Sequence, residues 1–585
     1  MNNLGDFDTN NFHKKIIVRI KFLLIILILV FIIIILRLFY LQIIKHNFFK
    51  EKAKLQLLRT IALAPHRGDI YDRNNQLLAT SINSYSVFAS PKQIKDPVKT
   101  AKILSVYLNE KEYEILKKLK SPGYFIWIKR KISSGLMNKI KKYKLPGIDF
   151  LTEKKRVYLY DNLASHVLGF VGIDNQGLGG VEYSQDKFLR GKEGKLIVEQ
   201  DPFGHEIITG KRYVQQATDG DNLILTIDQF IQYITERELK KAVKSTYATS
   251  GCAIVENPKT GEILAMATYP DFNPNDYSKC NISVFTNKNT NEVYEPGSTF
   301  KLITVSSALE EKVITPQSVF FCPPKLKVGP KTIGEAHSQG AVNKTVIDIV
   351  TESINVGTAQ IGLRMNKFKF YNHILKFGFG NQTGIELAVE TPGIVRNAKG
   401  WGKVDHAIIP FGQGIAITPL QLIQAVSAIG NNGKILKPYI IKGRFRNDRK
   451  FFKETPKTEK GIAISKETAN KMVSMMLNVV KRGTAKSIKI PGYSIGGKTG
   501  TAQVPNPNGI GYIPGRYIAS FVGLFPLNNP KVSILVVINN PRTTIWGSTA
   551  AAPVFKEIAK EIIYYMNIPP DNQKELLKAN NNTER

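Results

Sequence analysis

A long apolar segment near the N-terminus constrains the fold of this chain more than any other feature. Residues 22–36 are all Phe, Leu, Ile or Val, and after Arg37 the apolar character continues from Leu38 to Leu41. A stretch of about 20 apolar residues is long enough for a helix to cross the hydrocarbon core of a bilayer. We therefore predict a transmembrane helix over residues 22–41, preceded by a short cytoplasmic tail of residues 1–21.

A cleaved signal peptide is the alternative interpretation of this segment. The cleavage-like motif Ala62-Leu63-Ala64 lies more than twenty residues beyond the apolar run, which is too far for ordinary cleavage. Basic residues before the span favour a cytoplasmic N-terminus, but lysines also follow it, so charge alone does not decide the orientation. The basic residues are Lys14, Lys15, Arg19 and Lys21 before the span and Lys45, Lys50, Lys52 and Lys54 after it. Since most of the chain follows a single span, we predict an uncleaved anchor and an extracytoplasmic C-terminal part.

The net charge of +34 has two interpretations. It could indicate a polyanionic partner, such as nucleic acid, anionic lipid or a phosphate-bearing cell-envelope substrate. It could also follow from a genome that favours Lys, Asn and Ile. The lysines are spread along the chain and no nucleic-acid-binding module stands out, so no nucleic-acid partner is expected.

The cysteines indicate neither a zinc site nor a disulfide framework. The chain has three, Cys252, Cys280 and Cys322, with no CxxC spacing and no nearby histidine cluster. Zinc sites in proteins typically show such paired spacings. We therefore expect no metal and no diffusible cofactor.

The pattern beyond the span divides the chain into two parts. Residues 42–220 mix strand-like and helical segments, with a lysine-rich helical lobe near 97–145, and form a predicted first domain. Residues 221–568 form a predicted second domain, and residues 569–585 a polar tail expected to be disordered. Within the second domain we predict strands at 222–227, 251–256, 262–267, 518–525 and 532–538 and helices at 229–244 and 549–566. This order predicts an α+β, multidomain protein with a largely antiparallel sheet covered by helices.

A serine and a lysine three residues apart are the first candidates for catalysis. Ser298 and Lys301 lie at the start of a predicted helix over 299–311, so their side chains share one face. A serine hydroxyl becomes a strong nucleophile when a base takes its proton, and a lysine can be that base when burial or nearby cations lower its pKa. Alone, the pair is a weak signal, because an isolated match is more often a capping serine followed by a solvated lysine.

Two further segments make the catalytic interpretation specific. Ser353 and Asn355 lie two residues apart at a predicted helix–helix turn, where both can point into one cleft. Lys498-Thr499-Gly500-Thr501 follows Gly496-Gly497 in a predicted strand beside the cleft, where Gly500 permits close approach of a ligand. Serine-x-x-lysine, a Ser-x-Asn segment and Lys-Thr-Gly, in this order, form the motif set of β-lactamases and penicillin-binding proteins.

With these motifs the chain resembles the class B penicillin-binding proteins, the monofunctional peptidoglycan D,D-transpeptidases, and is most similar to the division-specific (FtsI-type, septal) branch. The resemblance runs from the anchor to about residue 565 and includes 67–74, 166–170, 179–183, 295–301, 411–415, 418–421 and 498–502. It implies that residues 221–568 are a serine β-lactamase-like transpeptidase domain and that residues 42–220 are a non-catalytic, dimerisation-like pedestal. Two departures from the family's usual residues weaken the choice of branch within the class. Ile354 stands where many division enzymes have Ser, and 387–390 reads Leu-Ala-Val-Glu in place of Leu-Pro-Gly-Glu.

The resemblance also implies a role for each motif residue. Ser298 would attack the penultimate D-alanine of a stem pentapeptide, Lys301 beside Lys498 would take its proton, and Ser353 would relay a proton to the departing D-alanine. Asn355 would bind the donor amide, while Lys498, Thr499, Gly500 and Thr501 would hold the terminal carboxylate. The backbone N–H groups of Ser298 and Thr501 would form the oxyanion hole. The implied partners are a septal glycosyltransferase, other division proteins and β-lactam antibiotics, at the septum of a bacterial inner membrane.

Several alternatives stay open at this point. An elongation-type class B transpeptidase shares all the motifs, and a membrane-tethered β-lactamase or a D,D-carboxypeptidase would use similar chemistry. The pedestal and the long separation from Ser353 to Lys498 argue against the last two. A non-enzymatic β-lactam-binding divisome scaffold, a β-lactam sensor and a bifunctional glycosyltransferase–transpeptidase are further candidates. The short N-terminal tail argues against a sensor, and the modest length of 60–220 argues against a glycosyltransferase domain.

Overall fold

The computed structural model describes residues 9–201, 207, 209–336, 340–446, 452–507 and 509–572. The chain forms two compact units: unit 1 comprises Met1–Pro65 and Lys192–Thr218, and unit 2 comprises His66–Gly191 and Asp219–Arg585. Of the predicted tails, residues 1–8 and 573–585 lie outside the described residues. The predicted domain boundary near residue 220 stays a prediction.

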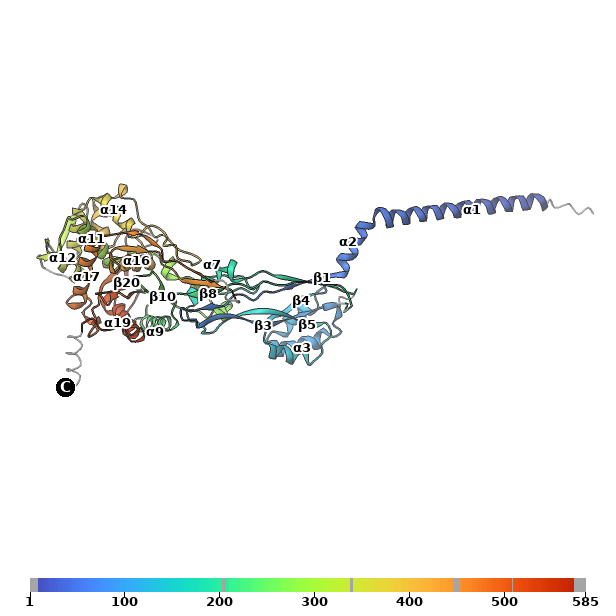
Figure 1. Ribbon diagram of the computed structural model, residues 1–585, viewed down its shortest axis with the longest axis horizontal. Helices are drawn as coiled ribbons and strands as arrows, with labels where there is room; N and C mark the ends of the chain where they lie inside the picture. The colour runs from blue at the N-terminus through green and yellow to red at the C-terminus, as the bar shows by residue number, and fades with distance from the viewer. Residues whose placement is uncertain are drawn as a thin grey trace, which may run out of the picture. The chain divides into compact units, whose positions relative to one another are not determined.

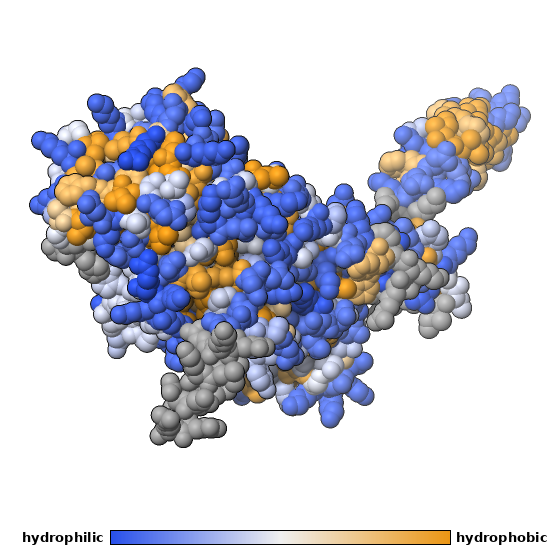
Figure 2. Space-filling model, turned by 60° about the vertical axis from the view of Figure 1, so that its left-hand side comes forward, coloured by the Kyte–Doolittle hydropathy of each residue, from blue (hydrophilic) through white to orange (hydrophobic). Residues whose placement is uncertain are grey.

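Unit 1 begins with a long apolar helix. Helix α1 (Thr9–Phe39) continues into a π-helical turn, η1 (Tyr40–Ile44), and is followed by α2 (His46–Leu57). Residues 10–44 include an 18-residue window with a mean hydropathy of 3.5, none of it buried. Its side chains form an orange band in Figure 2. Together, α1 and η1 contain the predicted span of 22–41 and extend beyond it at both ends. Residues 10–44 are long and apolar enough to cross a membrane.

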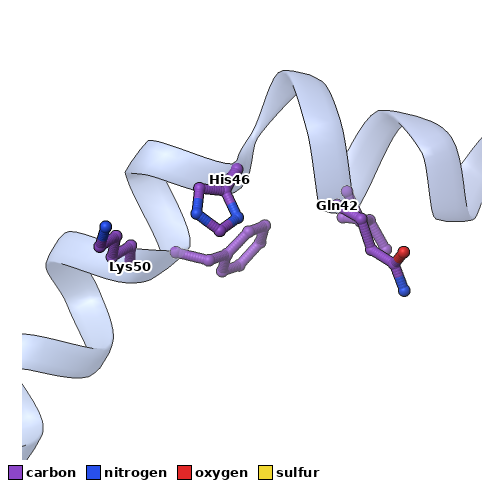
Figure 3. Close-up of a pocket in the computed structure, with 5 residues that line it drawn as sticks. Gln42, His46 and Lys50 are labelled. Atoms are coloured by element: carbon purple, nitrogen blue, oxygen red, sulfur yellow. The ribbon is translucent and has the colours of Figure 1, made fainter.

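Aromatic and basic side chains gather where the apolar helix ends. Arg37 and Lys45 lie 5.5 and 6.0 Å from the centre of the Tyr40 ring, and Lys52 lies 4.8 Å from that of Phe48. Aromatic rings with nearby cations are typical of the interface between hydrocarbon and water. A hollow beside η1 is lined by Leu41, Gln42, His46, Phe49 and Lys50 (Figure 3). It holds none of the predicted motif residues.

Unit 1 also contains a three-stranded antiparallel sheet. Its strand order is β1-β6-β7, with Leu58 opposite Glu199 and Leu63 opposite Gly194 in the first pair. The strands are β1 (Leu58–Leu63), β6 (Gly194–Glu199) and β7 (Arg212–Gln215).

A five-stranded antiparallel sheet forms the centre of unit 2 (Figure 1). Its order is β10-β9-β21-β20-β19, so β19, which carries Lys498, is the last strand at one side. The strands are β9 (Ser250–Glu256), β10 (Ile263–Tyr269), β19 (Gly496–Pro505), β20 (Tyr512–Phe525) and β21 (Val532–Asn539). The predicted antiparallel sheet is confirmed.

Helices cover both faces of this sheet. Every residue of β9 is buried, as is nearly every residue of β21, which explains why both strands read as continuous apolar runs and not as alternating patterns. Two pairs of helices pack on the sheet, and the two helices of each pair also contact each other. The pairs are α9 (Gln229–Ser245) with α19 (Ala552–Tyr565), and α16 (Pro419–Gly430) with α17 (Lys466–Lys481).

A second sheet of unit 2 joins strands from distant parts of the sequence. Its order is β17-β16-β8-β2-β3-β4, and β5 pairs with β3. The strands are β2 (Ile70–Tyr71), β3 (Leu77–Ala89), β4 (Ile126–Ile132), β5 (Ile148–Tyr158), β8 (Asn222–Leu225), β16 (Ile441–Phe445) and β17 (Phe452–Glu454). Three helices share a small hydrophobic core with β3 and β4. They are α3 (Pro97–Leu108), α4 (Glu112–Leu119) and α5 (Ser134–Lys141).

A buried ion cluster holds the start of unit 2 together. The Glu182 carboxylate accepts from Arg67 Nε and from Arg156 Nε, both at 2.6 Å, and Arg67 Nη1 also binds Asp186 at 2.6 Å. Arg67 and Glu182 are fully buried. The two guanidinium groups lower the pKa of the Glu182 carboxyl against the opposing effect of burial, which is the larger single influence.

Replacing Glu182 with Gln is expected to destabilise unit 2 by about 3–5 kcal/mol, because two buried guanidinium groups lose their shared counter-ion. Urea denaturation of the detergent-solubilised protein measures the change. Glu557→Gln is the matched control, since Glu557 pairs with Lys560 on the surface with nearly half of each side chain exposed. An equal loss of stability in the two variants would contradict the prediction.

Candidate active site

Ser298 lies in a short turn that leads into a buried helix. The turn is the 3₁₀ segment η5 (Gly297–Phe300), and α11 (Lys301–Glu310) follows it directly. Gly297 has φ +55°, and its N–H donates to the Gly412 carbonyl at 3.2 Å. A Cβ on Gly412 would lie 2.2 Å from the Gly297 carbonyl oxygen, so this close backbone contact requires glycine. The contact fixes the turn and places Ser298, half-buried, on the wall of a cleft of about 510 Å³.

Lys301 is buried beneath this cleft and donates to three oxygen atoms. Its Nζ lies 2.7 Å from the Ser353 carbonyl oxygen, 2.7 Å from Asn355 Oδ1 and 3.3 Å from Ser353 Oγ. The side chain has no solvent exposure. All three acceptors are uncharged, so no counter-ion touches the amine to offset the effect of its burial on the charged form.

Burial shifts the pKa values of both lysines. Burial lowers the pKa of the Lys301 amine to about 7, although the Glu335 carboxylate acts in the opposite direction. Burial also lowers the pKa of Lys498 well below its ordinary value, and the nearby Lys301 amine lowers it further. Lys498 Nζ donates to Thr499, to the carbonyl oxygen at 3.1 Å and to Oγ1 at 3.3 Å. Two close amines in a dry environment disfavour the simultaneous charging of both.

Ser353 and Asn355 occupy the turn between two helices, as predicted. Ser353 ends α12 (Val346–Glu352) in the left-handed conformation with φ +66°, and Asn355 begins α13 (Asn355–Arg364). The left-handed residue reverses the chain, so both Ser353 Oγ and Asn355 Oδ1 lie within hydrogen-bonding distance of Lys301.

Strand β19 forms another wall of the cleft. Thr499, Thr501 and Gln503 line it from one face of the strand, since alternate residues of a strand face the same side. Ala502 also lines the cleft. Gly500 faces the other side, where a Cβ would lie 2.3 Å from Ser520 Oγ. Thr501 also contacts the nucleophile's turn, because a Cβ on Gly297 would lie 3.2 Å from the Thr501 carbonyl oxygen. The strand is thus packed against the segment that carries Ser298.

The structure therefore brings all three motif segments to one cleft. Ser298, Ser353, Asn355, Thr499 and Thr501 line it, and the two lysines lie buried beside these residues. The two lysines and Gly500 are not lining residues: the amines contact the cleft through Ser353, Asn355 and Thr499.

Four features of the cleft were not predicted from the sequence. Thr484 Oγ1 lies 2.9 Å from Thr499 Oγ1, and the Gly547 N–H donates to Thr501 Oγ1 at 3.1 Å. Glu295 accepts from the Gly414 N–H at 2.8 Å and from the Tyr512 hydroxyl at 2.9 Å. Glu335 accepts from two amides of α13. Glu295 lies two residues before the Ser298 turn and belongs to the 295–301 motif, so of these residues Glu295 alone had a sequence signal that could have revealed it.

The arrangement suits acyl transfer. A hydroxyl in an open cleft and a buried amine with a pKa of about 7 are the two parts of a serine–lysine nucleophile. Within the described ranges, no group of three or more His, Cys, Asp or Glu side chains could hold a metal ion.

Comparison with protein families gives two matches. The model described as the penicillin binding protein transpeptidase domain matches residues 251–560. The model described as the penicillin-binding protein dimerisation domain matches residues 62–225.

Individual proteins are similar over nearly the whole chain. Stage V sporulation protein D of Bacillus subtilis (strain 168) is 36% identical over 561 residues, which cover 94% of this chain and 86% of that protein. Peptidoglycan D,D-transpeptidase FtsI of Escherichia coli (strain K12) is 32% identical over 543 residues, covering 91% and 89%. The crystal structure of penicillin binding protein 3 from Mycobacterium tuberculosis, complexed with aztreonam, superposes with a TM-score of 0.69 at 27% identity, covering 87% of this chain and 98% of that one.

Proposed function

Because the chain belongs to the class B penicillin-binding proteins and is a peptidoglycan D,D-transpeptidase of that family, we propose that it cross-links stem peptides through an acyl-enzyme on Ser298 during septal wall synthesis. The observation that carries the mechanism is the Lys301 amine, fully buried among uncharged acceptors one turn from Ser298. Such an amine loses its proton near neutral pH and can act as a general base.

In this mechanism Lys301 removes the proton of Ser298 Oγ as the oxygen attacks the carbonyl of the penultimate D-alanine. The backbone N–H groups of Ser298 and Thr501 stabilise the oxyanion, and each such donor is worth roughly 10²–10³ in rate. Ser353 Oγ, 3.3 Å from Lys301 Nζ, relays the proton to the nitrogen of the departing D-alanine. Lys301 is thereby neutral again when the amine of a second stem peptide attacks the acyl-enzyme and forms the cross-link.

The cleft offers separate groups for the peptide. Asn355 binds the amide of the donor stem, because its side chain lines the same cleft as Thr499 and Thr501 of β19. Thr499 and Thr501 bind the terminal carboxylate, and Lys498 polarises Thr499, to which it donates. Gly500 keeps the strand close to Ser520 and leaves the cleft side of β19 to the two threonines.

The acyl-enzyme formed with a β-lactam is expected to persist. Rapid hydrolysis would require a carboxylate or another base to activate a water molecule. Of the described residues that line the cleft, the two acids are Glu335 and Glu352. The Glu335 carboxylate accepts hydrogen bonds from two backbone N–H groups. The Glu352 carboxylate forms an ion pair with the Lys344 amine at 2.7 Å.

Labelling the detergent-solubilised wild-type protein with fluorescent penicillin tests this proposal. We expect one label per chain, located on the peptide that contains Ser298, and retention of the label after free antibiotic is removed. Rapid release of hydrolysed penicillin would indicate a β-lactamase instead. A folded protein that acquired no label would contradict the transpeptidase mechanism and leave a non-enzymatic scaffold.

The same proposal includes a role at the septum and a septal glycosyltransferase as partner. It also includes the orientation of the chain, with a cytoplasmic N-terminus and an extracytoplasmic catalytic domain. These parts are supported by similarity to the protein named FtsI and by the N-terminal apolar helix. Elongation is the alternative, and the name of the Bacillus subtilis relative adds sporulation. Depleting the protein while imaging a fluorescent fusion separates these roles: filamentous cells with septal fluorescence support division, and round cells support elongation.

A further inference from the structure

The Glu335 carboxylate binds the start of α13 from a distant part of the sequence. Glu335 follows the hairpin of β12 (Lys325–Val328) and β13 (Lys331–Gly334). The N–H of Asn355 donates to Oε2 and the N–H of Val356 to Oε1, both at 2.7 Å. The residue before the helix, Ile354, makes no capping bond. Since the first amides of a helix lack partners within it, Glu335 supplies the cap that the local sequence lacks, with a charge that complements the helix dipole.

The same end of the hairpin also orients the Asn355 side chain. Asn355 Nδ2 donates to the Gly334 carbonyl oxygen at 3.1 Å, while Asn355 Oδ1 accepts from Lys301 Nζ at 2.7 Å. Because the Gly334 carbonyl oxygen accepts a hydrogen bond from the nitrogen of the Asn355 side-chain amide, the amide oxygen faces the Lys301 amine. Gly334 and Glu335 therefore hold Asn355 by two hydrogen bonds, one on its backbone N–H and one on its side chain.

Glu335 also acts on Lys301 through its charge. Its carboxylate raises the pKa of the Lys301 amine and so opposes the lowering that burial produces. A general base is most effective when its pKa lies close to the working pH, so an amine left to burial alone would be a weaker base.

We propose that Glu335 is a positioning residue of the transpeptidase reaction, which holds Asn355 against the Lys301 amine and provides the negative charge that keeps this amine basic. The inference rests on the proposed role of Lys301 as the base. Glu335 acts through Asn355, Val356 and Lys301.

The test compares two substitutions at position 335 by their rates of penicillin acylation across pH. Glu335→Gln removes the charge and one of the two accepted bonds, so we expect acylation at neutral pH to slow by roughly ten- to a hundredfold. Because the unprotonated amine is the base, the rate falls at pH values below the pKa of Lys301. Loss of the anion lowers that pKa. The acid limb of the pH–rate profile, which is the range over which the rate falls as the pH decreases, therefore moves to lower pH in Glu335→Gln.

Glu335→Asp separates the effect of the charge from the effect of side-chain length. It also keeps the proposal testable if Glu335→Gln does not fold. It keeps the charge but is shorter by one methylene group, so it cannot reach both amides in the same way. We expect slower acylation with an acid limb near its wild-type position. A wild-type rate in Glu335→Asp would overturn the positioning role, and a limb as far displaced as in Glu335→Gln would overturn the role of the charge.

Asp228→Asn is the matched control. Asp228 Oδ1 accepts from the N–H groups of Phe230 and Ile231 at 3.1 and 3.2 Å, so it also caps a helix, α9, but it does not line the cleft. This variant should lose thermal stability while its pH profile stays unchanged. If Glu335→Gln behaves like Asp228→Asn, Glu335 is only a structural cap. If the wild-type protein itself acquires no label, the proposed function fails, and this role fails with it.

Discussion

Replacing Ser298 with alanine is expected to abolish both cross-linking and the covalent labelling by penicillin. The substitution removes the attacking oxygen, and loss of the nucleophile in serine acyl-transfer enzymes lowers kcat by roughly 10⁴–10⁶. The fold should be unaffected, because Ser298 lies on the wall of a cleft and its turn is held by the backbone contact between Gly297 and Gly412.

Two measurements check the Ser298 prediction. Gel fluorescence after incubation with labelled penicillin gives the covalent adduct, and complementation of a depleted strain gives the activity in cells. Ser474→Ala is the control, since Ser474 is an exposed serine of α17 and should behave as wild type. An adduct of wild-type yield on Ser298→Ala would show that another residue is the nucleophile, and normal growth would favour a scaffold.

Replacing Lys301 with methionine is expected to slow acylation by roughly 10²–10⁴, the usual contribution of a general base. Methionine has a similar length and suits the buried position, so Ser298 should stay in place. What is lost is the amine and its three hydrogen bonds to Ser353 and Asn355. Stopped-flow measurement of acylation by a chromogenic β-lactam gives the rate, and Lys471→Met, at the surface of α17 in an ion pair with Glu467, is the control.

The pH dependence gives the more specific result for Lys301. Burial lowers the pKa of this amine to about 7, and only its neutral form accepts the proton of Ser298. The wild-type rate should therefore rise about tenfold per pH unit below this value and level off above it, whereas Lys301→Met should lack this limb. A wild-type profile that is flat between pH 5 and about 8 would contradict the assignment of Lys301 as base.

The sequence predicted the central sheet well because its strands are buried on both faces. β9 and β21 are continuous apolar runs bounded by turn residues, and such runs are recognisable without any partner strand. β20 was predicted only from residue 518, yet it begins at Tyr512. Its first six residues lie at the exposed end of the hairpin with β19 and therefore carry no apolar pattern.

The start of the Ser298 helix shows the limit of periodicity. The apolar spacing predicted one helix from 299 to 311, but the structure has a 3₁₀ turn from 297 to 300 and an α-helix only from Lys301. The tighter turn follows from the positive φ of Gly297 and its contact with Gly412. A contact between residues more than a hundred positions apart leaves no trace in the local pattern.

Glu335 and Thr484 show why part of the site could not be found at all. Each acts on a motif residue across space, Glu335 on Asn355 and Thr484 on Thr499. Neither lies at a fixed spacing from any nucleophile or base, and an isolated acid or threonine is common on any protein surface. The motif residues were found because their spacing is local, whereas their supports become visible only when the chain is folded.

The position of β19 as the last strand of its sheet has a consequence for solubility. An outer strand with unpaired main-chain groups can recruit a strand from another molecule and start aggregation. In this protein the unpaired side of β19 borders a hollow whose other walls include Ser298 and the turn at Ser353. We expect a recessed border of this kind to hinder pairing with the flat edge of a neighbouring sheet, so this open strand should not promote self-association.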